Sequence, residues 1–159
     1  MNRDRESLDA LAIMRLQGRY GDTVTRQAWD ELVPLFLPDC PLRVDRGDGR
    51  TAELIGPEAI GRFIADAIAH FEFFAFTIVN TVVDVGADGV TASGRLYIHE
   101  LRQERDTHRW TDAYGLYRDT YTNDDGCWRF ATRDYSSMAR TTSTGDGMDV
   151  FPIPGLVAR

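Results

Sequence analysis

The chain has 159 residues, of which 43% are hydrophobic and 27% are charged, as expected for one globular domain of ordinary size. Its formal net charge is −7 and its basic residues are scattered, which argues against nucleic acid as a partner because a phosphate backbone requires a clustered basic face. There is no apolar run of membrane-spanning length and no apolar core of a signal peptide, so we expect a soluble, cytoplasmic protein that does not bind membranes.

The first half of the chain predicts three helices and a hairpin. In residues 6–24, apolar side chains recur at steps of three and four, the spacing of one helical face. A shorter helix is predicted over residues 27–36, although Pro34 lies inside it. Residues 42–55 alternate around a glycine-rich turn and predict a short hairpin. The third helix, residues 57–70, opens with a proline followed by an acidic residue, both favoured in a first helical turn.

In the second half the apolar period changes to two, which predicts four long strands joined by tight turns: residues 76–85, 90–101, 109–121 and 127–137. Helices followed by an antiparallel meander are typical of an α+β domain with its helices on one face of the sheet. A twisted sheet with helices across its concave side leaves a hollow, the usual place for a small-molecule site. The polar segment after Arg140 is expected to lie over the surface.

Three stretches together resemble a known family: Ile13–Tyr20 followed by Trp29–Leu32, then Gly56–Ile60, then Gly115–Tyr121 followed by Asp125–Phe130 and Arg133. In this order and spacing the chain resembles the SnoaL-like branch of the nuclear transport factor 2-like superfamily. The resemblance implies a cone-shaped α+β barrel, with three N-terminal helices packed on a curved, mainly antiparallel sheet. It implies a single domain over residues 1–159, with a core at 6–140 and an extended tail at 141–159. It also implies a homodimer formed through the outer face of the sheet.

The resemblance also points to two positions for proton transfer. Lyases of the family use an aspartate late in the first helix and a histidine entering the first long strand, the histidine acting as the base. The corresponding residues of this chain are Thr25 and Phe76. Neither side chain transfers a proton at neutral pH, so the usual Asp–His pair is replaced, which counts against a standard dehydratase.

Three other residues are candidate catalytic groups. The resemblance places Arg133 in the pocket, where it would hold an anion or leaving group; alternatively it pairs with a nearby acid such as Asp134 or Asp112. Tyr20 either polarises a carbonyl or packs its ring in the core. His99 is the best remaining base if its face of the strand is concave, and a surface or dimer contact if that face is convex. A register shift of one residue reverses the two outcomes.

The pocket wall is expected to be largely aromatic, which favours a small, apolar, ring-bearing ligand. His70 either complements the dipole of the third helix or replaces the family histidine from a displaced position. Asp22 shares a helix face with Thr25 and is more simply a solvated or capping residue. The pocket-lining candidates are Thr25, Trp29, His70, Phe73, Phe76, Tyr97 and Tyr117.

The sequence predicts neither a metal site nor a cofactor. Cys40 and Cys127 have no metal-ligand spacing and are expected to be reduced thiols, and the three histidines have no such spacing either. We therefore expect a lyase, isomerase or cyclase that acts on an apolar, ring-bearing molecule without a redox cofactor. The alternative is a non-catalytic binding protein for a hydrophobic small molecule. The retained tyrosine and arginine favour the enzyme, whereas the loss of both family positions favours the binding protein.

Overall fold

The first element of the computed structural model, which describes residues 3–153, is helix α1 (Arg3–Arg26). Its buried apolar side chains lie three or four positions apart and form one face: Ile13, Leu16, Tyr20 and Val24. Gln27, with a φ of 57°, takes the left-handed conformation that commonly ends a helix. The predicted helix over 6–24 is confirmed and is slightly longer at both ends.

The helical segment expected over residues 27–36 is present as two short 3-10 turns, η1 (Trp29–Glu31) and η2 (Val33–Leu35). Pro34 lies within η2 and has no backbone N–H, which prevents a continuous α-helical hydrogen-bond pattern. The turns nevertheless bury Leu32 and Leu35, so the segment caps the core as the apolar pattern requires.

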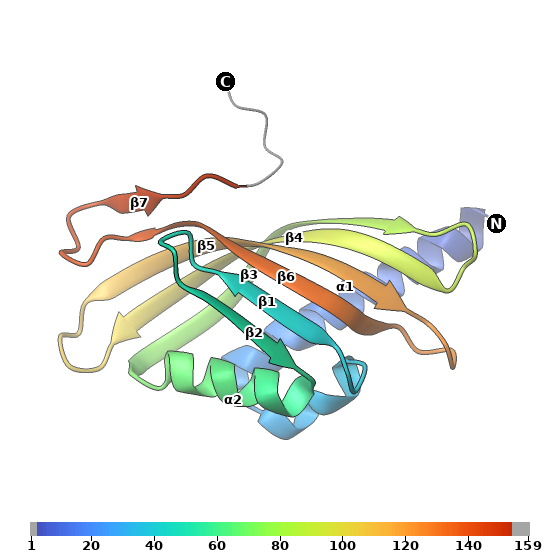
Figure 1. Cartoon of the computed structure of the whole chain (residues 1–159), viewed down its shortest axis with the longest axis horizontal. Coiled ribbons are helices and arrows are strands. Elements are labelled where there is room, and N and C mark those ends of the chain that lie inside the picture. The colour runs from blue at the N-terminus through green and yellow to red at the C-terminus, as the bar shows by residue number, and fades with distance from the viewer. Residues whose placement is uncertain (1–2, 154–159) are drawn as a thin grey trace.

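Strands β1 (Pro41–Asp45) and β2 (Thr51–Ile55) form the predicted hairpin. Helix α2 (Pro57–Ile68) follows at once, and Gly56, with a φ of 84°, makes the sharp change of direction between β2 and α2. The helix ends two residues before the predicted boundary at His70. These elements bring the β1–β2 hairpin and α2 together at one edge of the sheet (Figure 1).

Four long strands make up most of the sheet: β3 (Phe71–Val85), β4 (Thr91–Glu104), β5 (Trp110–Thr122) and β6 (Arg129–Thr141). The strand order is β2-β1-β6-β5-β4-β3, and every pair is antiparallel except β1 with β6. Helix α1 packs along β3 and helix α2 lies beside β2, the strands at the two edges of the sheet. The sheet is curved, and both helices lie on its concave side (Figure 1). The predicted α+β fold with a curved, mainly antiparallel sheet is confirmed.

The structure differs from the predicted strands in two ways: one long strand starts earlier, and the tail contains an additional strand. Strand β3 begins at Phe71, five residues earlier than predicted, because residues 71–75 pair with the end of β4. The tail after Arg140 contains a short strand, β7 (Met148–Val150), that pairs with the end of β6. Of the tail predicted over 141–159, residues 154–159 lie outside the described part of the chain, as do residues 1–2.

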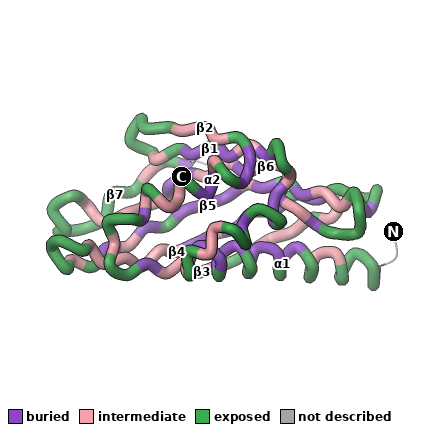
Figure 2. The backbone as a smooth tube through the Cα atoms, turned by 90° about the horizontal axis from the view of Figure 1, so that it is seen from below, coloured by how far each residue is buried: buried purple, intermediate pink, exposed green. Residues whose placement is uncertain are grey.

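The core lies between α1, the 3-10 turns and the centre of the sheet. Buried residues follow one side of α1 and the middle of the long strands (Figure 2). In the described part of the chain, no helix is both long enough and apolar enough to cross a membrane. The core fills one part of the concave face, and the other part, towards α2, remains hollow.

Candidate active site

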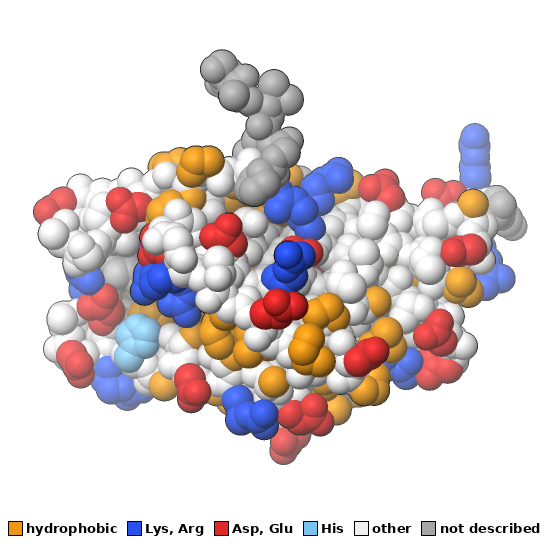
Figure 3. Space-filling model, viewed as in Figure 1, with side chains coloured by type: hydrophobic (Ala, Val, Ile, Leu, Met, Phe, Trp, Pro, Cys, Tyr) orange, Lys and Arg blue, Asp and Glu red, His pale blue; other side chains and the backbone are white. Residues whose placement is uncertain are grey.

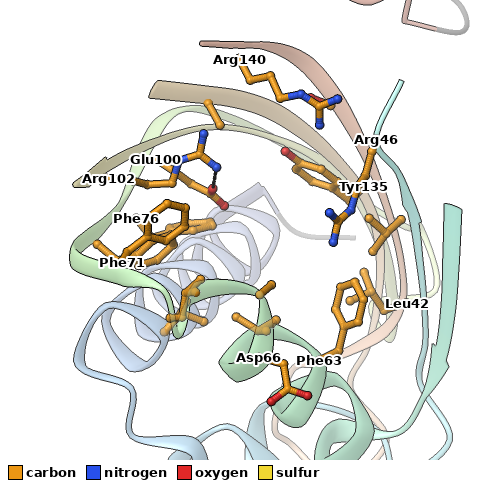
Figure 4. Close-up of a pocket in the computed structure, with 18 of the residues that line it drawn as sticks. Leu42, Arg46, Phe63, Asp66, Phe71, Phe76, Glu100, Arg102, Tyr135 and Arg140 are labelled. Carbon is orange, nitrogen blue, oxygen red and sulfur yellow. Dashed lines mark ion pairs between the residues drawn. The ribbon is translucent and has the colours of Figure 1, made fainter. Parts of the chain in front are cut away.

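A cavity of about 490 Å³ lies between the concave face of the sheet and helix α2 (Figure 4). This volume is typical of a site for a small molecule. Half of its lining residues are apolar, and burial against them stabilises the apolar part of a ligand. The apolar lining residues are Val24, Leu42, Val44, Phe63, Ile64, Ala67, Ile68, Phe71, Phe74, Phe76 and Ala113.

Two charged side chains of β4, Glu100 and Arg102, lie in one wall of the cavity (Figure 4). The Glu100 Oε2 atom is 3.7 Å from an Arg102 guanidinium nitrogen, and the Glu100 side chain is 20% exposed. Burial raises the pKa of the Glu100 carboxyl, and the charge of Arg102 offsets this only in part. A carboxyl with a raised pKa is suited to accept and return a proton near neutral pH.

Three tyrosines also line the cavity. The hydroxyl oxygens of Tyr20 and Tyr117 are 3.3 Å apart, within hydrogen-bonding distance. Tyr135 lies against Gly115 of β5, where a Cβ atom would collide with its ring, so the glycine provides the space for this tyrosine. Burial raises the pKa of all three phenols. They therefore remain protonated and can donate hydrogen bonds to a ligand oxygen.

The family described as SnoaL-like domain matches residues 5–134 of the chain. The chain belongs to the SnoaL-like family. The resemblance inferred from the sequence is thereby confirmed, and the nuclear transport factor 2-like architecture agrees with it. A search of curated proteins finds no significant match.

Solved structures of this architecture are similar to the SnoaL-like chain over nearly its full length. A provisionally assigned scytalone dehydratase from Novosphingobium aromaticivorans has a TM-score of 0.78 and 20% identity, with 99% of this chain and 100% of that chain covered. Hexachlorocyclohexane dehydrochlorinase LinA-type3 from Novosphingobium barchaimii has a TM-score of 0.71 and 17% identity, with 94% and 96% covered. At these identities the comparisons establish the fold.

Thr25 and Phe76, which the resemblance aligns with the Asp–His pair of the family's lyases, are adjacent in this structure. The Thr25 hydroxyl oxygen accepts a hydrogen bond from the Phe76 backbone N–H at 3.0 Å. Gly21 allows this approach, because a Cβ there would lie 2.9 Å from the Phe76 ring. Thr25 does not line the cavity, whereas Phe76 does. At this place the chain has a structural link, the hydrogen bond between Thr25 and Phe76.

We expect Thr25→Ala to cost about 1 kcal/mol of unfolding free energy, the size of one partly buried hydrogen bond. Any activity should fall by roughly tenfold or less, because no proton-transfer group is lost. Urea denaturation and initial rates would measure the two effects. A loss of activity far above tenfold, with stability little changed, would contradict a purely structural role.

Arg133 lies behind the cavity wall, where its side chain is 1% exposed. Its guanidinium donates two hydrogen bonds to Asp119, at 2.9 and 3.1 Å, and contacts the rings of Tyr20 and Tyr117 at 4.1 and 3.9 Å. The sequence alternatives named Asp134 and Asp112 as partners, whereas the actual partner is Asp119. Arg133 does not line the cavity, and its guanidinium contacts two tyrosine rings that do.

His99 and Tyr97 do not line the cavity, and the proposed role of His99 as the base in the pocket is corrected. The side chains of β4 alternate, and the inward face carries Ile98, Glu100 and Arg102. His99 lies on the outer face, where its Nε2 atom is 2.6 Å from Asp112 and its ring stacks on Tyr114.

The remaining candidates divide between the cavity and the surface. His70 lines the cavity at the end of α2, with its ring centre 3.9 Å from that of Phe71. Trp29 lies instead in a smaller hollow beside α2, and Phe73 contacts Trp110 on the outer face of the sheet. Asp22 forms an ion pair with Arg26, as expected for a solvated acid. Within residues 3–153, no three His, Cys, Asp or Glu side chains are grouped as metal ligands.

Sequence reasoning missed Glu100 and Arg102, although a signal for them was present. The even-numbered residues Ala92, Leu96 and Ile98 of β4 are apolar, whereas the odd-numbered face carries mainly polar residues. Continuing the apolar face by two more steps reaches Glu100 and Arg102. A charged pair on the apolar face of a strand is the signal for a polar group that faces a cavity.

Proposed function

We propose that this SnoaL-like protein is a cofactor-independent lyase or isomerase that moves a proton on a small, ring-bearing molecule. The observation that carries the proposal is the Glu100 carboxyl, which lines the cavity beside an aromatic wall and has a pKa raised by burial. The names of the structural neighbours support the reaction class, since they include a dehydrochlorinase and a provisionally assigned dehydratase.

In an elimination, the Glu100 carboxylate takes the proton of a C–H bond. The electron pair of that bond forms the new double bond, and the neighbouring group leaves with the electrons of its own bond. One of the hydrogen-bonded Tyr20 and Tyr117 hydroxyls donates to the other, and the second donates to the oxygen or leaving group on which negative charge develops. In an isomerisation, Glu100 returns the same proton to a different carbon.

Proton exchange tests this function without knowledge of the natural substrate. The probe is 2-tetralone, a bicyclic ketone with acidic C–H bonds, incubated with the protein in D₂O and followed by proton NMR. We expect the protein to accelerate the loss of the C–H signals beside the carbonyl. Exchange no faster than in buffer, with the probe bound, would overturn the enzyme proposal.

The second candidate is a non-catalytic binding protein. One observation favours it: Thr25 and Phe76, which the resemblance aligns with the family's Asp–His pair, are linked by a hydrogen bond. In that case the cavity binds aromatic molecules and catalyses no exchange. Glu100 is the feature that the binding protein leaves unexplained, because an apolar ligand does not need a buried carboxyl.

We also propose that the protein is a homodimer formed through the outer face of the sheet. Phe73, Trp110 and Tyr114 are exposed there, with Trp110 at 52%. A two-fold axis would allow this one apolar surface to cover itself in both copies. Sedimentation at micromolar concentration should give twice the chain mass of 17.9 kDa. A mass equal to that of one chain would contradict the dimer.

A further inference from the structure

One end of the cavity is lined by three arginines. Arg46 and Arg50 belong to the β1–β2 hairpin, and Arg140 lies near the end of β6. Figure 4 shows the Arg46 guanidinium directed into the hollow, across from Glu100 and Arg102. A cavity for a neutral hydrocarbon does not require cations at this position, because removing a cation from water has a free-energy cost unless an anion compensates it.

The acidic side chains near this end do not balance the arginines. Asp48 forms an ion pair with both Arg50 and Arg140, each at 2.5 Å, so that one carboxylate serves two guanidiniums. For Arg46, no ion pair or side-chain hydrogen bond is found with any residue of the described chain; its side-chain contact is the Phe63 ring, 6.0 Å away. Asp66 also lines the cavity, but its carboxylate points away from the arginines (Figure 4). The arginine end therefore keeps a surplus of positive charge.

This positive charge is a local feature of the cavity. On the face that Figure 3 shows, arginine and acidic side chains are mixed, with no continuous basic surface among the described residues. The whole chain is acidic, with a net charge of −7. A small anion is therefore drawn to the cavity end by nearby guanidiniums and not by the overall charge of the protein.

The arginine end is held in place by neighbouring contacts. Arg140 lies between Asp48 and the Phe151 ring, whose centre is 4.9 Å from the guanidinium carbon. The backbone N–H of Phe151 donates to the Met138 carbonyl at 3.0 Å, which fixes the tail next to the hairpin. A guanidinium held like that of Arg140 binds a carboxylate or a sulfonate with little loss of side-chain entropy.

We propose that the cavity binds a ring-bearing molecule that carries a negatively charged group, a carboxylate or sulfonate, with this group at Arg46 and Arg140 and the ring against the aromatic wall. The inference deepens the proposed function and rests on it for the orientation of the reacting carbon. The carboxylate of Glu100 repels an anion, so the charged group lies at the arginine end and the ring presents its C–H bonds to Glu100.

A matched pair of fluorescent probes tests the charge preference. 1-Anilinonaphthalene-8-sulfonate and N-phenyl-1-naphthylamine share one aromatic frame, and only the first carries a sulfonate. We expect the native protein to bind the sulfonate at least tenfold more tightly. In Arg46→Met the affinity for the sulfonate should fall roughly tenfold or more, which is the effect of losing one hydrogen bond to a charged group. The affinity for the neutral probe should change less than about twofold.

The control is Arg43→Met, which removes the same charge from β1 on the face away from the cavity, where Arg43 is exposed. It should leave both dissociation constants unchanged. Ala67→Trp fills the cavity from α2 and should abolish binding of both probes, which locates them. If Arg46→Met does not fold, Arg46→Gln provides the same comparison.

The inference is overturned if the native protein binds the neutral probe as tightly as the sulfonate, or if Arg46→Met keeps the preference. It is also overturned if Ala67→Trp binds the sulfonate unchanged, since the probe then lies elsewhere. Glu100→Gln separates the two proposals, because it should retain or improve sulfonate binding while proton exchange is lost. Proton exchange without a preference for the charged probe would contradict only the anion site. A preference for the charged probe without proton exchange would contradict only the enzyme proposal.

Discussion

Glu100→Gln should lower the rate of proton exchange by about a hundredfold to ten-thousandfold, the range expected when a general base is removed. Glutamine has nearly the same shape and volume as glutamate, so the cavity and its aromatic wall are preserved. It has no carboxylate to accept the proton. The measurement is the initial rate of deuterium incorporation into 2-tetralone, with probe binding measured in parallel to show that the site is intact.

The pH dependence of the native rate gives an independent check. A base acts in its deprotonated form, so the rate should rise with pH and level off above the pKa of Glu100. Burial raises that pKa above the ordinary glutamate value, which moves the rise towards neutral pH. The matched control is Glu53→Gln, an exposed residue of β2 outside the cavity lining, which should keep the full rate and the same profile. A Glu100→Gln variant with the native rate would exclude Glu100 as the base.

The fold was predictable because its main elements have clear apolar periods. The apolar face of α1 predicts a helix buried on one side, and the alternation along the long strands predicts strands with alternate residues buried. The structure shows both patterns. The boundaries were less predictable, because they depend on pairing between distant segments. The start of β3 at Phe71 is determined by the end of β4, and β7 pairs with residues 139–141 of β6, beyond the part of β6 that pairs with β1.

The site was predictable only in part, for a geometric reason. Tyr20, His70, Phe76 and Tyr117 were expected in the cavity and do line it. The choice of His99 depended on which face of β4 is concave, and adjacent residues on a strand face opposite ways. The residue type alone also does not show what a buried arginine contacts. Arg133 could contact a ligand or a buried carboxylate, and its partner in the structure is Asp119.

Arg133→Met should lower the free energy of unfolding by about 3–5 kcal/mol, the cost of breaking a buried ion pair by removing one partner. The side chain fills the space between Tyr20, Tyr117 and Phe130, and methionine retains much of that apolar packing. The loss therefore comes mainly from Asp119, which remains buried without its guanidinium. Urea denaturation followed by circular dichroism would measure it.

The pH dependence distinguishes this charge effect from a packing defect. Burial raises the pKa of Asp119 and Arg133 lowers it, so removing Arg133 leaves the carboxyl more easily protonated in the folded state than in the unfolded one. The folded variant then binds more protons, and its stability falls as pH rises from the ordinary aspartate pKa through the raised one. The deficit should be smallest in acid and largest at neutral pH, and Arg133→Met with Asp119→Leu should recover part of it. Arg43→Met, which breaks only an exposed pair with Asp134, should cost less than about 1 kcal/mol. A deficit for Arg133→Met that is equal at all pH values would assign the loss to packing and contradict the charge explanation.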